Sequence, residues 1–270
     1  MTARRMSSLR PAALFLMLLV AVPASGQNAD PRSGIRPEEK RSGYTFMSRE
    51  TRAMQDDDLA NPGTLWALEG EASWRAAAGA TGKSCASCHQ DAAVSMKGVA
   101  ARYPAFEPRS SAVINLEQRI NLCRVDRQQS PPLAYESKEL LALTTYVANQ
   151  SRGMPVRVVI DGPARPFFQA GRDLYFRRQG QLNLACNQCH DERWDGQLRG
   201  DRITQGHGNA YPEYRLEWQT VGSLQRRLRG CTIGVRAEPY AYGSQEYVNL
   251  ELYLAWRAQG LPIETPGVRR

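Results

Sequence analysis

The chain has 270 residues, of which 42% are hydrophobic, and a formal charge of +8. This length is enough for two domains of ordinary size. The charge does not come from a basic run, so nucleic-acid binding is not indicated, and an anionic small substrate or an acidic partner fits better. No apolar stretch reaches the ~20 residues that a membrane-spanning helix needs.

Residues 1–26 have the three parts of a secretory signal peptide. The basic head contains Arg4 and Arg5, an apolar run covers residues 11–22, and small residues follow at 24–26. The apolar run is too short to span a bilayer. We therefore expect this segment to be removed on export and the mature protein to act in a bacterial periplasm.

Residues 27–64 form a polar segment that contains no haem-attachment motif. Three successive aspartates at 56–58 and the Asn-Pro-Gly turn at 61–63 interrupt any long periodic pattern. We expect an N-terminal extension that lies as an arm on the surface of the domains.

Two Cys-x-x-Cys-His motifs, at residues 85–89 and 186–190, carry the clearest chemical signal. In each motif, two thiols three positions apart can form thioethers with both vinyl groups of one haem, and the following histidine can ligate the iron. The sequence therefore predicts two covalently bound c-type haems. The attachment residues are Cys85, Cys88, Cys186 and Cys189, and the proximal iron ligands are His89 and His190.

The motifs belong to a longer internal repeat. Gly70 and Trp74 recur as Gly171 and Tyr175, at the same offset of 101 residues as the motifs. The glycines are expected to let two helices cross closely, and the aromatic side chains are expected to pack in the core.

The segments that close the two repeated units also match, at an offset of 107 residues. Residues 143–148 and 250–255 have the character of helices, and each is followed by a Gly-x-Pro stop. Glycines and prolines within residues 152–166 indicate a linker, with a short strand expected at 156–160.

This order of elements is typical of class I cytochrome c domains, in which the first and last helices pack across each other. We therefore expect a mainly α protein with two tandem class I cytochrome c-like domains related by duplication. The first domain covers residues 65–155 with haem 1, and the second covers residues 156–270 with haem 2 and the active site.

Each haem iron has either a ligand or an open coordination position on the side opposite its proximal histidine. From residue 156 onward the chain contains no methionine and no lysine, so only His207 and Cys231 remain for haem 2. The His–Met pair of common electron carriers is therefore not available to this haem from its own domain. The candidates in the first domain are Met96, Lys97, Cys123, Lys138 and Met154.

Cys123 and Cys231 occupy equivalent places, 34 and 41 residues after their proximal histidines and before the closing helices. We interpret both as distal thiolate ligands, which would give both haems low potentials. The alternative is a Cys123–Cys231 disulfide, because spare cysteines in an oxidising compartment usually pair. Equivalent points of tandem domains seldom lie within the ~7 Å Cα separation that a disulfide allows. His207 is the rival ligand for haem 2, or a loop residue near the mouth of the site.

Arg227 lies four positions before Cys231, so a helix would place both on one face. A guanidinium beside a thiolate can hold an oxyanion. Arg226 and Arg229 would then point elsewhere, as parts of an ordinary solvated basic face.

Several stretches together resemble the dihaem SoxA family of the periplasmic thiosulfate-oxidising system. The Arg227/Cys231 pair and the two distal cysteines are more selective than the haem motifs, which many cytochromes share. The matching stretches are residues 46–47, 51–57, 206–209, 211–212, 227–231, 235–239 and 246–251.

The resemblance implies an L-cysteine S-thiosulfotransferase, which joins thiosulfate oxidatively to a carrier cysteine of SoxY in the SoxYZ complex. Electrons would pass through haem to a SoxX-type monohaem cytochrome subunit. By the same resemblance, Cys231 ligates haem 2 and carries a persulfide during turnover, Arg227 binds the sulfonate group, and Cys123 ligates haem 1 without a substrate role. His207 is a weaker candidate for substrate binding.

Two other functions fit parts of the sequence. A non-catalytic dihaem electron-transfer cytochrome c would require His–Met ligation, which the second domain cannot supply by itself. A haem-based sensor, in which a gas or sulfide displaces Cys231, agrees with the same residues. Replacing Cys231 distinguishes the transferase from the electron carrier, because only the transferase would lose turnover altogether.

Overall fold

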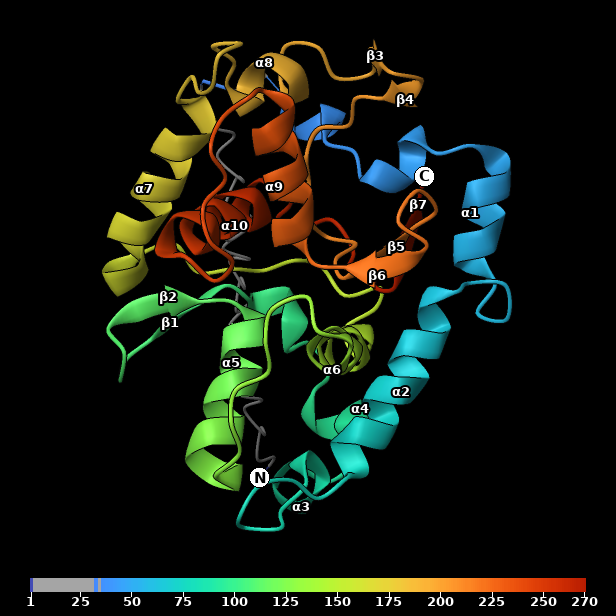
Figure 1. Ribbon diagram of the computed structural model, residues 1–270, viewed down its shortest axis with the longest axis vertical. Coiled ribbons are helices and arrows are strands. Elements are labelled where there is room, and N and C mark those ends of the chain that lie inside the picture. Colours follow the sequence, from blue (N-terminus) through green and yellow to red (C-terminus); the bar gives the residue numbers. More distant parts are fainter. Residues whose placement is uncertain (2–31, 34) are drawn as a thin grey trace.

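The computed structural model describes Met1, residues 32–33 and residues 35–270 (Figure 1). Beyond Met1, the predicted signal peptide lies outside the described residues. The described part is mostly helical, as expected, with short strands between the helices. Its principal helices are α1 (Arg49–Asp56), α2 (Gly63–Arg75), α3 (Cys85–His89), α4 (Ala92–Ser95), α5 (Leu116–Cys123), α6 (Lys138–Asn149), α7 (Arg165–Phe176), α8 (Cys186–His190), α9 (Leu224–Gly234) and α10 (Gln245–Arg257).

The shorter elements connect these helices, and the strands add buried valines to the core. They are the 3-10 turns η1 (Pro37–Glu39), η2 (Gly43–Phe46), η3 (Ala100–Arg102) and η5 (Gly162–Ala164), and the π-turn η4 (Arg124–Gln128). The strands are β1 (Ala105–Glu107), β2 (Ala112–Ile114), β3 (Gln197–Leu198), β4 (Asp201–Arg202), β5 (Glu213–Arg215), β6 (Thr220–Gly222) and β7 (Gly267–Arg269).

Helices α6 and α10 begin at side-chain caps and are buried along most of their length. The hydroxyl of Ser137 accepts a hydrogen bond from the Leu140 amide, and Ser244 does the same for Tyr247. Helix α6 is buried from residue 140 to 148, and α10 from 247 to 254. A helix that is buried on all sides is mostly apolar all around, and the few polar residues of these two stretches, such as Thr145 and Glu251, are buried with the rest.

The two buried helices are crossed by α2 and α7, which form the first helices of the predicted units. A Cβ on Gly70 would lie 2.1 Å from the Ala142 carbonyl oxygen, so only glycine permits this approach of α2 to α6. Trp74 packs on Tyr146 with ring centroids 5.9 Å apart, and Tyr175 on α7 packs on Tyr253 of α10 at 5.1 Å. The predicted close crossings and the core position of both aromatic residues are confirmed.

Similar hairpins precede α5 and α9. Strand β1 pairs antiparallel with β2, and β5 pairs antiparallel with β6. In the second case the C-terminal strand β7 adds to β5 in parallel, which gives the order β6-β5-β7. Figure 1 shows α2–α6 grouped in one half of the molecule and α7–α10 in the other.

The prediction of a strand at residues 156–160 is wrong. Val156 and Val158 are buried, but the segment passes between other loops without a ladder partner. The Val156 amide donates to the Leu261 carbonyl, and the Arg157 amide donates to the Ala101 carbonyl. The alternating valines therefore reflect burial of a connecting segment rather than membership of a sheet.

The described residues before α2 pack on the C-terminal half (Figure 1). Lys40 Nζ donates to the Gln259 carbonyl at 2.9 Å, and the Arg41 amide donates to Gln205 Oε1 at 2.8 Å. The Asn61 side chain precedes the N-cap Pro62 of α2 and accepts a hydrogen bond from the Gly63 amide at 2.9 Å. The helix therefore begins at residue 63, two residues before the predicted domain boundary.

Among the described residues, no helix combines the length and the hydropathy that crossing a bilayer would require.

Candidate active site

The first attachment motif forms the short helix α3, which begins at Ser84. The Ser84 hydroxyl accepts a hydrogen bond from the Ser87 amide, and the Ser87 hydroxyl accepts one from the Ser84 amide. The His89 ring lies 5.7 Å from the Trp74 ring, and Trp74 Nε1 donates to the carbonyl of Gln90. A capped turn and a buried aromatic side chain therefore fix the direction of the motif histidine.

A cavity of about 620 Å³ opens beside this motif. Apolar side chains of α2, α5 and α6 form much of its wall, and sulfur and nitrogen ligand atoms face it from two elements. Its lining includes Trp74, Cys85, Cys88, His89, Met96, Leu116, Cys123, Leu143 and Val147. This mixture of apolar walls, two motif thiols and an imidazole fits a covalently attached haem.

Cys123, at the end of α5, shares this cavity with the attachment thiols. Burial raises the pKa of the Cys85 thiol, and the nearby Cys123 raises it further, which places these two sulfurs close together. Met96, another of the candidate ligands in the first domain, also lines the cavity. Two sulfur-bearing side chains beyond the attachment cysteines therefore face the first site.

The second attachment motif forms α8, and its histidine is held from behind by a loop. His190 Nδ1 donates to the Thr204 carbonyl at 2.7 Å, which leaves Nε2 free to bind a metal. Burial lowers the pKa of His190 to about 4, so the ring is neutral, as an iron ligand must be. Gly206 lies against this ring, because a Cβ at that position would come within 3.1 Å of His190 Cγ.

A buried ion pair supports the end of α8. The Asp191 carboxylate accepts from Arg257 Nη2 at 2.6 Å and from the Tyr175 hydroxyl at 2.9 Å. The two charged side chains are 1% and 4% exposed. Arg257 Nη2 also donates to the Gln205 carbonyl, so the pair joins α7, α8, α10 and the loop behind His190.

Cys231 lies on α9, close enough to the second attachment thiols to act on them electrostatically. Burial raises the pKa of Cys186 to about 12, and the Cys231 sulfur is the next cause. Cys231 also raises the pKa of Cys189. The residue is exposed, whereas Cys123 is half-buried, so the second site offers its free sulfur to solvent more openly than the first.

Arg227 lies one helical turn before Cys231, as the spacing predicted. Its side chain is 41% exposed, and its closest carboxylate is Glu217, with Nη1 and Oε1 3.9 Å apart. Arg226 instead covers the Trp218 ring at 4.5 Å, and Arg229 covers the Tyr242 ring at 4.6 Å. The prediction that Arg226 and Arg229 point elsewhere is confirmed, and Arg227 is the arginine of this run that accompanies the thiol.

The first site contains an equivalent pair that the sequence reasoning missed. Arg119 lies four residues before Cys123, and both are offset by 108 from Arg227 and Cys231. Arg119 Nε donates to the Tyr103 hydroxyl at 3.0 Å, and Nη2 lies 3.7 Å from the buried Glu107 carboxylate. This guanidinium is thus engaged by internal partners. Extending the repeat past its helices to this offset would have found the pair.

His207 does not lie at an open mouth. The residue is half-buried, and Nε2 lies 3.2 Å from Gln205 Oε1. Burial lowers the pKa of His207 well below its ordinary value, and the nearby His190 contributes. The residue therefore belongs to the loop that also holds the proximal histidine from behind.

All six cysteines lie in the described part of the chain, and none forms a disulfide. Cys123 stands with the first attachment thiols, and Cys231 stands with the second set. The Cys123–Cys231 disulfide considered from the sequence is therefore wrong. Tandem placement keeps the two equivalent cysteines in separate sites.

Comparisons with known proteins agree over most of the chain. A family model described as "SoxA/TsdA, cytochrome c domain" matches residues 69–156 and again residues 170–263. The L-cysteine S-thiosulfotransferase subunit SoxA of Pseudaminobacter salicylatoxidans is 41% identical over 234 residues, which cover 86% of this chain and 82% of that protein. The protein of the same name from Rhodovulum sulfidophilum is also 41% identical, over 87% of this chain and 82% of its own length.

A solved structure gives the same result for the fold. The crystal structure of SoxXA from P. pantotrophus contains a chain that superposes with a TM-score of 0.82 at 36% sequence identity. The match covers 85% of this chain and 86% of the other.

Proposed function

This chain belongs to the SoxA family, and from that membership we propose that it is an L-cysteine S-thiosulfotransferase subunit acting at its second haem site. The observation that carries the proposal is the position of Cys231. It is an exposed thiol on α9, one turn after Arg227 and facing a Cys-x-x-Cys-His motif. An anion holder and an electron acceptor thus flank one sulfur nucleophile.

Two covalently bound c-type haems fit the residues that surround the motifs. Cys85 and Cys88 would hold the first haem, and His89 and Cys123 would bind its iron. Cys186 and Cys189 would hold the second haem, and His190 and Cys231 would bind its iron. When bound, haem supplies a one-electron acceptor that thiolate ligation keeps at low potential.

The reaction joins thiosulfate to the thiol of a carrier cysteine. One S–S bond forms, the carrier S–H bond breaks, and one proton and two electrons leave. Thiosulfate carries two negative charges and the resulting thiosulfonate group carries one, so the charges balance when the proton and electrons are counted. The electrons pass to a SoxX-type cytochrome partner, and the carrier is a SoxYZ-type protein.

Two side chains of α9 would have separate roles in this reaction. Cys231 would carry a persulfide whose outer sulfur joins thiosulfate as the two electrons leave. The carrier thiol would then give up its proton, take over the thiosulfonate group and set the Cys231 persulfide free again. The Arg227 guanidinium, half-exposed at the mouth, holds the sulfonate oxygens by charge-assisted hydrogen bonds. His207 lies behind His190 and would support the proximal loop rather than contact substrate.

The first site is the less suitable one for this reaction, although it has the same Arg–Cys spacing. Arg119 already donates to Tyr103 and faces Glu107, so its guanidinium has fewer donors for an anion. We therefore assign Cys123 as an iron ligand without a substrate role.

The remaining features fit the same function. The two units, residues 65–155 and 156–270, derive from a duplication of one cytochrome c domain, and residues 27–64 form the extension. With residues 1–26 as a cleaved signal peptide, the protein would act in the periplasm.

The test is replacement of Cys231 by alanine in the purified complex with the SoxX-type partner. Formation of carrier-bound sulfonate from thiosulfate should be lost, while both haems stay attached through their own motif cysteines. If the Ala variant retains turnover, the chain is instead a non-catalytic electron-transfer cytochrome.

A further inference from the structure

A line of alternating charges runs from Arg227 into the interior of the second unit. Arg227 Nη1 lies 3.9 Å from Glu217, whose carboxylate also accepts from Arg215 Nε at 3.1 Å. Arg215 Nη1 in turn donates to Glu213 at 3.0 Å. The candidate substrate arginine is thus the outer end of a connected polar network.

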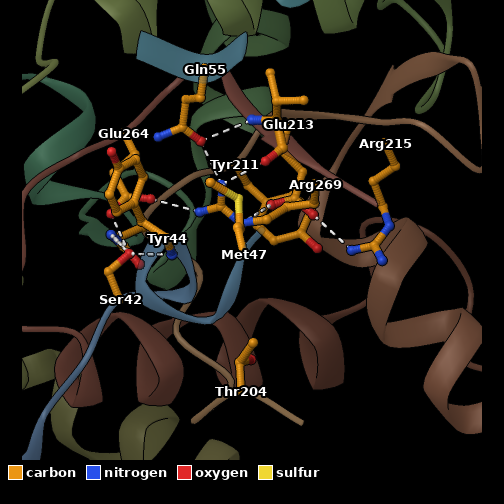
Figure 2. A network of polar contacts seen from close by, with 12 residues as sticks. Ser42, Tyr44, Met47, Gln55, Thr204, Tyr211, Glu213, Arg215, Glu264 and Arg269 are labelled. Carbon is orange, nitrogen blue, oxygen red and sulfur yellow. Dashed lines mark hydrogen bonds and ion pairs between the residues drawn. The ribbon is translucent and has the colours of Figure 1, made fainter. Parts of the chain in front are cut away.

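The inner end of this network contacts α1 and the C-terminal segment that includes β7. Glu213 Oε2 lies 3.9 Å from Arg269 Nε, and Arg269 Nη2 donates to Glu264 at 2.6 Å. Arg269 also bonds Gln55 of the N-terminal extension. Figure 2 shows Gln55, Glu213 and Glu264 gathered around Arg269, with Arg215 of the same strand as Glu213 bonded to its carboxylate.

Burial changes sharply along the line. The side chains of Arg215 and Glu213 are 9% and 3% exposed, whereas those of Glu217 and Arg227 are 46% and 41% exposed. Arg215 is further held over the Trp218 ring at 5.2 Å. Glu217 is therefore anchored from below by a rigid arginine, while its contact with Arg227 is long and open to water.

A long, exposed ion pair is weak, so an incoming anion can displace it. A sulfonate oxygen that bonds a guanidinium directly forms a stronger charge-assisted contact. The anion at Arg227 also changes its charge in the proposed reaction, from the dianion thiosulfate to a monoanionic thiosulfonate group. The monoanionic Glu217 carboxylate competes more evenly with the product than with the substrate.

We propose that Glu217 is a positioning residue that acts as a resident counter-anion for Arg227, displaced by thiosulfate and returning to the guanidinium as the product leaves. The proposal rests on the proposed anion-binding role of Arg227. Glu217 thereby assists product release, and Arg215 holds the Glu217 carboxylate at the mouth of the site.

The first unit has a different arrangement around its equivalent arginine. The position equivalent to Glu217 is Arg109, which pairs with Asp126 at 2.7 Å. The carboxylate near Arg119 is Glu107, which lies on β1 and is 7% exposed. A half-exposed carboxylate that can exchange with a solvent anion is thus a feature of the second site in this comparison.

The test replaces Glu217 by glutamine, which can still accept a hydrogen bond from Arg215. The holo complex is assayed for the KM of thiosulfate, for kcat, and for inhibition by S-sulfocysteine as a monoanionic product analogue. The KM should fall by roughly 1.5- to 5-fold, and inhibition by S-sulfocysteine should become stronger. Because exposed charges are screened, the difference from wild type should shrink as salt rises.

Two controls separate this role from a structural one. Glu139→Gln makes the same charge change on an exposed residue of α6 and should leave the KM unchanged. In an Arg227→Ala background, Glu217→Gln should no longer lower the KM, because its effect passes through the guanidinium.

A rise in KM for Glu217→Gln, or an unchanged KM when Arg227→Ala raises it, would overturn the counter-anion role and leave the proposed function intact. If Arg227→Ala itself has no effect on the KM, the anion-binding role of Arg227 fails, and the proposal for Glu217 fails with it.

Discussion

Gly171 of α7 approaches Asn249 of α10 so closely that a Cβ on the glycine would lie 1.9 Å from the Asn249 carbonyl oxygen. Gly70 has the same relationship to Ala142 at 2.1 Å. In both cases the obstacle is backbone rather than a flexible side chain. The crossings therefore depend on the absence of a side chain at one position in each pair of helices.

Gly171→Ala should lower the free energy of unfolding by at least about 2 kcal/mol, because α7 must move away from α10 to admit the methyl group. Urea denaturation followed by circular dichroism measures this change. Gly234→Ala is the matched control, since no atom lies within 4 Å of its added Cβ. Equal stability of the two variants would contradict the close-crossing explanation.

Loss of the buried carboxylate beside α8 should lower the free energy of unfolding substantially. Asp191→Ala leaves the Arg257 guanidinium buried without its carboxylate partner, so we expect a loss of about 3–5 kcal/mol. Glu71→Ala breaks an exposed pair with Arg75 and should cost less than about 1 kcal/mol. Thermal unfolding of both variants provides the comparison, and similar melting temperatures would refute the assigned role of the buried pair.

Stability should fall as the pH rises toward mild alkalinity. Burial raises the pKa of Glu117 on α5 to about 7 and that of Glu251 on α10 to about 8, and each carboxyl sits near another one. Groups whose pKa is raised by folding favour the native state when neutral. Their contribution is complete below the ordinary value of 4.5 and is lost as the pH rises through about 7 to 8.

Glu251→Gln should flatten this dependence, because the amide stays neutral at every pH. The measurement is the free energy of unfolding of wild type and variant between pH 5 and pH 9. Parallel curves would show that the pair does not control the alkaline loss of stability.

The anion-binding role of Arg227 predicts a specific kinetic change. Arg227→Ala should raise the KM for thiosulfate by roughly 10- to 100-fold, the effect of losing a charged hydrogen-bond donor. Arg226→Ala is the control, since that guanidinium stacks on Trp218 instead. If both variants raise the KM equally, a general basic field would explain the data better than a contact at Arg227.

Local spacing was sufficient to predict the attachment motifs, the closing helices and the Arg227/Cys231 pair. Each depends on residues within about one or two helical turns, where the sequence separation largely determines the distance. The strand expected at 156–160 failed because alternation of valines reports burial and does not say whether a neighbouring strand is present.

Long-range partners could not be predicted in this way. Glu217 reaches Arg227 because the β5–β6 hairpin turns the chain back toward α9, and the strands of that hairpin are only three residues long. Glu117 and Glu251 meet although 134 residues separate them. Such contacts depend on how the two units pack, and no local pattern records that.

The central claim is that Cys231 carries the transferred sulfur, and the most direct measurement is the mass of one peptide. Cleavage of the unreduced protein at arginine residues releases residues 230–236, which contain Cys231. The proposed function predicts a peptide with one additional sulfur atom on this cysteine after exposure to thiosulfate and carrier. A Cys231 peptide that stays unmodified through turnover, or one joined to the Cys123 peptide, would contradict it.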